Sequence, residues 1–332
     1  MSLLRIEDLS VTFDVRGRGD WPWTPVRKLQ AVRALSFEVA EGETLGVVGE
    51  SGSGKSTLAR AIVGTVPASG GKILWDGSDL AALGPAQRRK HRKSVQMIFQ
   101  DPLAALNPRM TVGEIIAEPL RTHHPDTAKP DMRRKVGEMM ERVGLLPNLV
   151  NRYPHEFSGG QCQRIGIARA LILGPKLVLC DEPVSALDVS VQAQVVNLLQ
   201  ALKRDMGLSL IFIAHDLSVV KHISDRIAVM YLGTLLEIGA ADQVCRAPRH
   251  PYTKALISAV PVPDPAVEKA RRPAVLEGEL PSPMAPPSGC VFRTRCPVAL
   301  PRCADQIPAL RWMDGAHAHA CPVVAAEAQH PA

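Results

Sequence analysis

The chain has 332 residues, 46% hydrophobic and 22% charged, which is enough to bury a sizeable core and excludes a disordered or fibrous protein. Its longest apolar runs, such as 208–214, fall far short of the roughly 18 residues of a membrane-spanning helix, and Glu7 and Asp8 interrupt any signal peptide, so we expect a soluble protein that is not exported. The net charge of +6 suits an anionic partner but does not choose among nucleotide, nucleic acid and membrane surface.

Up to about residue 245, short β-branched apolar runs alternate with stretches compatible with helices. The predicted strands are 44–48, 177–180 and 210–214, and the predicted helices are 112–120, 132–143 and 161–173. This alternation predicts an α/β fold with a mostly parallel sheet covered by helices. Residues 17–25, with Trp21 and Trp23, predict an inserted hairpin loop, and the basic run 88–93 predicts a solvated helix face.

Residues 49–57, Gly-Glu-Ser-Gly-Ser-Gly-Lys-Ser-Thr, fit the phosphate-loop pattern between a strand and a helix. Glycines let backbone N–H groups converge on a phosphate, and the helix N-terminus adds the positive end of its dipole. Lys55 is predicted to reach the β- and γ-phosphates, and the Ser56 hydroxyl to bind magnesium. The predicted nucleotide ligands in this loop are Gly49, Ser51, Gly52, Ser53, Gly54, Lys55, Ser56 and Thr57.

Two adjacent carboxylates, Asp181 and Glu182, follow the apolar run 177–180. The carboxyl end of a parallel strand is where open α/β sheets place their ligands. We therefore predict that Asp181 holds magnesium through water, and that Glu182 is the general base for an attacking water.

The run Phe157-Ser-Gly-Gly-Gln161, followed by residues 164–171, resembles the signature sequence of ATP-binding cassette (ABC) ATPases. The resemblance spans residues 3 to about 245. It implies an ABC-type nucleotide-binding domain over 1–245, with a phosphate-loop core sheet and a helical subdomain at about 101–172. It also assigns Gln100 as the Q-loop residue near magnesium and the γ-phosphate, residues 185–188 as the D-loop, His215 as the switch histidine, and Phe13 as the ring that stacks on adenine.

The resemblance further implies that one chain forms half of a dimer. The signature would contact the γ-phosphate held by the phosphate loop of a second ATPase subunit. Residues at a helix start offer a hydroxyl, N–H groups and a dipole to that phosphate; the predicted contacts are Ser158, Gly159, Gly160, Gln161 and Asp188. An ordinary serine-capped helix would explain Ser158 but not the glycines or the glutamine.

Three longer runs, 100–120, 181–194 and 249–256, resemble the ATPases of dipeptide and oligopeptide importers. The Val184-Ser185 pair and the N-terminal insertion are closer to the second, F-type ATPase of such importers. This kinship implies ATP-driven peptide uptake at the cytoplasmic face of the cell membrane. The implied partners are a second, different ATPase subunit, two transmembrane permeases and, indirectly, an extracytoplasmic substrate-binding protein, with no nucleic acid.

Other functions compete with peptide import. Relatives import nickel chelates or glutathione, and an ATPase sequence does not touch the cargo. Soluble ABC ATPases that act on ribosomes or DNA carry paired cassettes or long coiled coils, neither of which this sequence shows. A phosphate-loop kinase would leave the signature run unexplained.

The last segment, 246–332, predicts a small Pro- and Cys-rich extension, since 15 of the 28 prolines lie from Pro248 onward. Four thiols at Cys290, Cys296, Cys303 and Cys321 suit a metal centre that would cross-link a segment with little core of its own. The extension is similar to that of peptide-importer ATPases with a four-iron cluster, so iron–sulfur is favoured, with zinc and free thiols as alternatives. His317 and His319 lie close enough in sequence to substitute as metal ligands, but the favoured interpretation is that they are tail residues. Cys162 and Cys180 are expected to be core residues.

Overall fold

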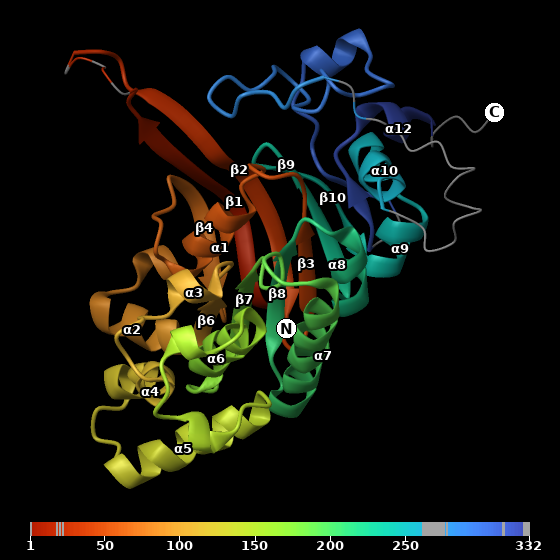
Figure 1. Ribbon diagram of the computed structural model, residues 1–332. Coiled ribbons are helices and arrows are strands. Elements are labelled where there is room, and N and C mark those ends of the chain that lie inside the picture. The colour runs from red at the N-terminus through yellow and green to blue at the C-terminus, as the bar shows by residue number, and fades with distance from the viewer. Residues whose placement is uncertain are drawn as a thin grey trace, which may run out of the picture. The chain divides into compact units, whose positions relative to one another are not determined.

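The computed structural model describes residues 2–17, 19, 21, 23–260, 276, 278–313 and 316–327. The chain forms two compact units, each interrupted in sequence. The first unit comprises Met1–Leu3, Val39–Thr44 and Leu80–Ala214, and the second comprises Leu4–Glu38, Leu45–Asp79 and His215–Ala332. Figure 1 shows the elements of both.

In the first unit, three parallel strands lie in the order β8-β7-β6. They are β6 (Val95–Ile98), β7 (Leu177–Asp181) and β8 (Ser209–Ala214). Every residue of β7 and β8 is buried, as expected for strands covered on both faces. The predicted strands 177–180 and 210–214 are confirmed.

The helices of this unit include the three predicted at 112–120, 132–143 and 161–173, with ends that differ from the predicted ones by up to three residues. They are α2 (Pro85–Ser94), α3 (Pro102–Ala105), α4 (Val112–His123), α5 (Lys129–Arg142), α6 (Gly159–Leu171) and α7 (Val189–Met206), with short 3-10 turns at Leu80–Ala82, Pro147–Leu149 and Pro154–Glu156. Helix α4 contains Pro119 and ends at His123, three residues beyond its predicted end at 120. Its start is fixed by a capping box between Thr111 and Glu114.

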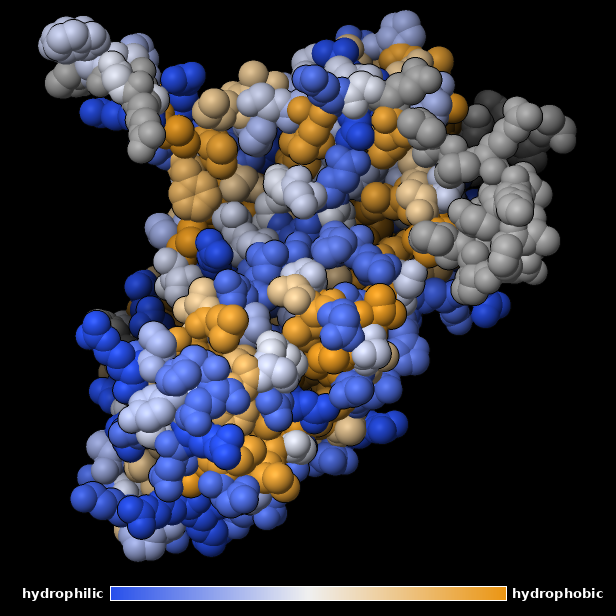
Figure 2. Space-filling model, in the orientation of Figure 1, coloured by the Kyte–Doolittle hydropathy of each residue, from blue (hydrophilic) through white to orange (hydrophobic). Residues whose placement is uncertain are grey.

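The basic run lies on α2, and five of its six residues are exposed or half-buried while His91 is buried. Figure 2 shows hydrophilic residues gathered over α2 and α5. Among the described residues, none of the helices combines the length and the hydropathy needed to cross a bilayer.

The second unit holds two sheets. In the antiparallel one the order is β2-β1-β4-β5, with β1 (Ser2–Val15), β2 (Arg27–Ala40), β4 (Gly70–Trp75) and β5 (Ser78–Asp79). The other runs β11-β12-β10-β9-β3, with β3 (Thr44–Val48), β9 (Arg226–Tyr231), β10 (Thr234–Ala240), β11 (Arg311–Trp312) and β12 (Ala318–His319). Strands β3 and β9 are parallel, and the other pairs are antiparallel.

The helices that the structure describes in the second unit are short. They are α1 (Lys55–Val63), α8 (Leu217–Ile223), α9 (Ala241–Arg246), α10 (Pro251–Ser258) and α12 (Pro322–Glu327), with a 3-10 turn at Pro301–Ala304. Between β1 and β2, Trp21 and Trp23 stack with ring centroids 5.1 Å apart. The hairpin predicted at 17–25 includes residues 18, 20 and 22, which lie outside the described residues.

The Pro- and Cys-rich segment packs its apolar side chains on the second unit. Phe292 is fully buried, and its ring centroid lies 5.3 Å from both Tyr231 of β9 and Tyr252 of α10. Strand β12 pairs with β10, aligning His319 with Glu237. The segment therefore shares a core with β9, β10 and α10, which compensates for the few apolar residues it contributes.

A buried carboxylate, Glu237 of β10, joins this segment to the sheet. Its oxygens accept the backbone N–H groups of Arg249 at 2.7 Å and His250 at 2.8 Å, and lie 2.7 Å from Nε2 of His317. Burial alone raises the pKa of Glu237, but its hydrogen bonds, that of His317 foremost, outweigh burial and lower it.

The prediction that His317 and His319 are tail residues is wrong. The two are 4% and 1% exposed. His317 contacts Glu237, and Nδ1 of His319 accepts the N–H of Cys321 at 3.3 Å. An imidazole ring can be buried as long as its nitrogens are hydrogen-bonded, so the presence of a histidine does not by itself predict whether the position is buried or exposed.

His250 makes this part of the fold sensitive to acid. It caps α10 by accepting the Tyr252 N–H at Nδ1, and burial lowers its pKa to about 3. Between its ordinary pKa near 6.5 and about 3, the unfolded chain binds the proton that the folded chain excludes, so stability falls as pH falls through that window.

We expect His250→Asn to flatten this pH dependence, because Asn keeps a capping acceptor but does not titrate. Thermal unfolding at pH 7 and pH 5 measures it: the wild type should lose more Tm on acidification than the variant, by about 2–4 °C for each kcal/mol of His250 protonation energy. Glu237 and His319 are present in both proteins, so the difference between the two profiles reports on His250 together with its coupling to these two groups. Parallel pH profiles would contradict the assignment.

Candidate nucleotide-binding site

The predicted phosphate loop lies between β3 and α1 in the second unit. All five residues of β3 are buried, so the loop begins from a fixed strand end. Gly54 is the N-cap of α1 and has no side chain, which leaves the first N–H groups of the helix without a cap from that position. Such N–H groups bind anions at helix N-termini.

Two loop glycines are required by crowding against backbone. A Cβ atom on Gly54 would lie 2.1 Å from the carbonyl oxygen of Ala31, and one on Gly49 would lie 2.1 Å from that of Met230. Gly52 differs: its φ of +80° is left-handed, but a Cβ there would meet no described atom within 4 Å.

Lys55 folds over the first half of the loop. Its Nζ donates to the carbonyls of Gly49 at 2.7 Å and Glu50 at 3.0 Å, and the residue is 4% exposed. Ser53 is buried as well, and its carbonyl accepts the Gly233 N–H at 2.9 Å. Ser51 and Gly52 are exposed, and Ser56 and Thr57 are half-buried.

The carboxylate pair lies at the end of β7 in the first unit, where the sequence placed it. Asp181 is the last residue of the strand and is 2% exposed. Nε2 of Gln100 donates to Oε2 of Glu182 at 2.9 Å. The structure thus brings together two predicted catalytic residues that are 82 positions apart.

The backbone of Glu182 is in the left-handed region, with φ of +47°. For a residue with a side chain this conformation costs about 1–2 kcal/mol, and such strain concentrates at functional sites. Two hydrogen bonds hold this turn. The Glu182 N–H donates to the Ile213 carbonyl at 3.0 Å, and the Ser185 hydroxyl donates to the Glu182 carbonyl at 3.1 Å.

The signature segment forms the start of α6. Ser158 is the N-cap, its Oγ accepts the Gln161 N–H at 3.4 Å, and the Gln161 side chain accepts the Ser158 N–H at 3.0 Å. This capping box gives Gln161 a structural role that the sequence interpretation had missed.

The two signature glycines differ. A Cβ on Gly160 would lie 2.6 Å from Cγ1 of Val191, so packing against α7 explains that glycine. A Cβ on Gly159 would lie 3.6 Å from Leu187, an ordinary contact. Packing within the chain therefore does not account for Gly159.

The remaining predicted residues have clear local positions. Asp188 caps α7, and hydrogen bonds from Ser190 and from the Val191 N–H lower its pKa. Phe13 of β1 is 36% exposed, so its ring is not a core side chain. His215 is exposed, directly before the capping residue of α8, Asp216.

Six of the seven cysteines fall into two groups. Cys162 and Cys180 are buried, as predicted, and burial raises the pKa of Cys180 to about 12. The second group consists of free thiols, Cys290, Cys296, Cys303 and Cys321. Burial is the main cause that raises the pKa of Cys290 to about 11, and the charges of the other three thiols contribute, which indicates that the four lie near one another.

The predicted metal centre is not supported. Within the described residues, which include all four of these cysteines, no group of three or more Cys, His, Asp or Glu side chains is arranged to hold a metal ion. The four-iron cluster predicted at Cys290, Cys296, Cys303 and Cys321 therefore lacks a formed ligand set, and the zinc alternative lacks one too.

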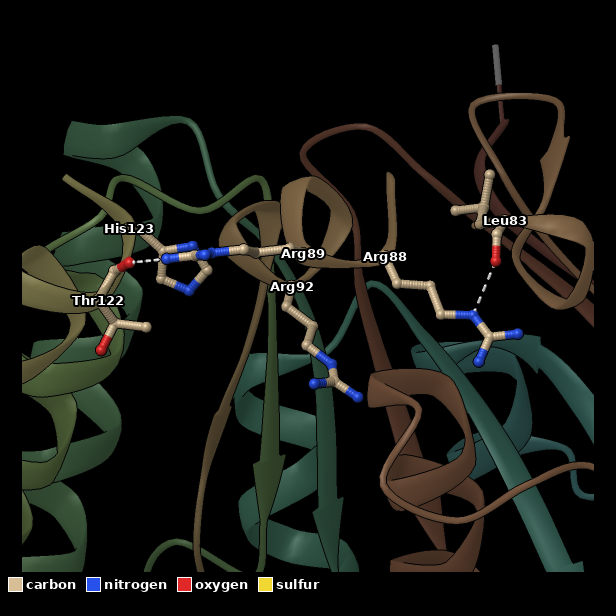
Figure 3. Close-up of a pocket in the computed structure, with 6 residues that line it drawn as sticks. All are labelled: Leu83, Arg88, Arg89, Arg92, Thr122 and His123. Carbon is tan, nitrogen blue, oxygen red and sulfur yellow. Dashed lines mark hydrogen bonds between the residues drawn. The ribbon is translucent and has the colours of Figure 1, made fainter. Parts of the chain in front are cut away.

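A basic pocket lies elsewhere in the first unit, between α2 and the end of α4 (Figure 3). Its lining comprises Leu83, Arg88, Arg89, Arg92, Thr122 and His123. Nε of Arg88 donates to the Leu83 carbonyl at 2.9 Å, and Arg89 donates to the Thr122 carbonyl. These two arginines thus join α2 to neighbouring backbone, which is a structural role.

Sequence reasoning missed a contact on the phosphate loop. Nη1 of Arg295, in the Cys-rich segment, lies 2.8 Å from Oε2 of Glu50, the second residue of the loop. The two are 245 positions apart, and neither the loop pattern nor the cysteine spacing signals the pair.

The second unit carries a strand followed by a glycine-rich loop with an invading lysine, and the first unit carries a strand-end carboxylate paired with glutamine. Each is a feature that the resemblance to ABC ATPases predicted. The model of the ABC transporter family matches residues 32–185, and that of the oligopeptide/dipeptide transporter C-terminal region matches residues 236–303. The chain belongs to the ABC transporter family.

Close relatives cover nearly the whole chain. It is 65% identical to the oligopeptide transport ATP-binding protein OppF of Salmonella typhimurium, over 96% of this chain and 94% of that protein. The identity to OppF of Escherichia coli is 65%, over 93% and 92%, and to OppF of Haemophilus influenzae 60%, over 96% of each.

Solved structures share the fold. CbiO1 of Clostridium perfringens, part of an ABC transporter complex, is 25% identical with a TM-score of 0.63, covering 74% of this chain and 91% of its own. The ATP-binding cassette MJ0796, dimeric and bound to ADP and Pi, has the same identity and TM-score, covering 72% and 98%.

We expect Gly54→Ala to unfold the loop region, because its Cβ must displace the Ala31 carbonyl. The matched control is Gly52→Ala, which meets open space and should cost only about 1–2 kcal/mol of left-handed strain. Urea unfolding without nucleotide measures both. Equal losses of stability in the two variants would show that crowding does not constrain Gly54.

Proposed function

We propose that this protein is an ATPase subunit that powers the uptake of oligopeptides through a membrane-embedded permease. The observation that carries the proposal is the Gln100–Glu182 pair at the end of β7, in a chain with a complete phosphate loop and 60–65% identity to OppF proteins. Nickel chelates and glutathione remain the alternative cargoes, and that kinship favours peptides.

The site residues divide the chemistry of hydrolysis among them. The loop N–H groups and Lys55 would bind the phosphates, and the exposed ring of Phe13 would stack on adenine. Glu182 would take a proton from the attacking water, held in place by Gln100, and His215 would contact the γ-phosphate. Magnesium, when bound, would offset phosphate charge, with Ser56, Asp181 and Gln100 as its proposed ligands.

Dimerisation is the second part of the proposal. Gly159 has room for a side chain within its own chain, so a phosphate that approaches its backbone from outside would explain why glycine stands there. The start of α6 would supply that phosphate with N–H groups and a helix dipole. The dimeric, ADP- and Pi-bound state of MJ0796 is a precedent for such an arrangement.

Glu182→Gln tests the catalytic assignment. The amide keeps the shape and the Gln100 contact but cannot accept a proton, so we expect ATP binding to persist and steady-state phosphate release to fall at least about a hundredfold. Glu41→Gln, an exposed carboxylate in the turn between β2 and β3, is the matched control. Hydrolysis at the wild-type rate by Glu182→Gln would disprove the general-base role.

The permease is proposed to dock beside Gln100. Two large apolar side chains are exposed there, Phe99 at 43% and Leu103 of α3 at 56%. The Arg169 guanidinium lies 5.7 Å from the Phe99 ring centroid, and donates to the Ala105 carbonyl at 2.6 Å. An exposed apolar patch on a firmly held turn suits a short helix of a partner. Docking there would place the protein at the cytoplasmic face of the membrane. Its ATPase domain, 1–245, would pair there with that of a second ATPase subunit.

We expect Leu103→Cys to form a disulfide with cysteines introduced along the cytoplasmic loops of the permease in the assembled importer. Ile307→Cys is the control, since Ile307 is 68% exposed and lies in the segment after 246. Non-reducing gel analysis would show the adduct. A loop scan that yields adducts from position 307 but none from position 103 would remove the docking assignment.

The last part of the proposal is an iron–sulfur cluster in the extension at 246–332. An iron–sulfur cluster at its four cysteines rests on their spacing and mutual proximity, and since the described residues form no ligand group, no step of hydrolysis is assigned to it. Iron and acid-labile sulfide analysis of the purified protein distinguishes a cluster from zinc and from free thiols.

A further inference from the structure

Every polar group of Glu50 in the phosphate loop is engaged. Its N–H donates to the Tyr252 hydroxyl at 2.9 Å, and its carboxylate meets Arg295 at 2.8 Å. Its carbonyl accepts Nζ of Lys55 at 3.0 Å and the Ser53 N–H at 3.1 Å. The position of Glu50 therefore sets where the phosphate-binding lysine lies.

Arg295 is itself fixed before it reaches the loop. Its side chain is 9% exposed, its guanidinium lies 5.9 Å from the Tyr231 ring centroid, and Nη1 also reaches the Tyr231 hydroxyl at 3.4 Å. The Tyr231 ring packs edge-on against Tyr252 and Phe292, at 4.8 and 5.3 Å. A rigid aromatic base thus presents both Arg295 and Tyr252 to Glu50.

The charge of the pair matters as much as its geometry. A carboxylate at the second position of a loop that binds a triphosphate repels that ligand, because like charges a few ångströms apart destabilise each other. Arg295 neutralises the carboxylate without occupying the loop. Both partners are shielded from solvent, at 9% and 27% exposure, so salt screens this interaction less than a surface pair.

We propose that Arg295 is a positioning residue for nucleotide binding, through which the Cys-rich segment sets the affinity of the phosphate loop for a nucleoside triphosphate. The inference rests on the proposed role of residues 49–57 as the ATP site. It makes the segment after 246 a regulator of that site: any change that moves Arg295, one position before Cys296, alters the loop.

The test compares ATP binding and hydrolysis by the full chain carrying Arg295→Met, Arg295→Lys or Arg293→Met. Arg293 is the matched control, since it lies in the same segment and, among the described residues, donates to Ser288 rather than to the phosphate loop. Arg295→Met should weaken ATP binding and raise KM about tenfold, the size of one charge-assisted hydrogen bond, with kcat changed much less. Arg295→Lys should recover part of the affinity, and Arg293→Met should match the wild type.

A double-mutant cycle with Glu50→Gln separates positioning from general stability. Without the carboxylate there is no charge to neutralise, so Arg295→Met should have a smaller effect on the Kd for ATP in the Glu50→Gln background. Equal effects in both backgrounds, or an unchanged Kd in a folded Arg295→Met protein, would overturn the inference. If the wild-type chain itself fails to bind ATP, the proposed function fails instead.

Discussion

The close approach of backbone to backbone at the phosphate loop is the constraint on which the site depends. The carbonyl oxygens of Ala31 and Met230 occupy the space that side chains at positions 54 and 49 would need. Only glycine satisfies both, and the loop then has one course between β3 and α1. Its N–H groups and Lys55 are consequently preorganised, which lowers the entropy lost when an anion binds.

A buried carboxylate whose hydrogen bonds offset the cost of its burial explains how the proline-rich segment stays attached to the sheet. Burying the carboxylate of Glu237 is unfavourable in isolation. Two backbone N–H groups and an imidazole satisfy it, and all three come from residues after 248. The sheet therefore supplies a buried acceptor that only the correctly folded segment can match, while the aromatic cluster around Phe292 adds apolar burial.

Much of the fold and site was predictable because its signals are local. Strand β7 and its carboxylates form one continuous pattern, and the parallel-sheet rule then places Glu182 at a ligand-binding edge, where Gln100 was found. Long-range pairs carry no such pattern. Arg295 and Glu50 meet only because the chain returns after 245 positions, and His317 was misjudged because a histidine in a proline-rich stretch gives no hint of a distant buried partner. The role of Gln161 differs from these, since its cap is local and the Ser-x-x-Gln spacing of residues 158–161 signals it.

The close packing of Gly160 against Val191 has a mechanical consequence. With no side chain between them, the first turns of α6 and α7 have no slack to slide past each other, so a push on one is delivered to the other. The N-cap of helix α7, Asp188, lies six residues after Glu182, and the intervening turn hydrogen-bonds back to the Glu182 carbonyl through Ser185. Within this unit, a displacement of α6 would thus be transmitted through the start of α7 and the short turn before it to Glu182 at the end of β7.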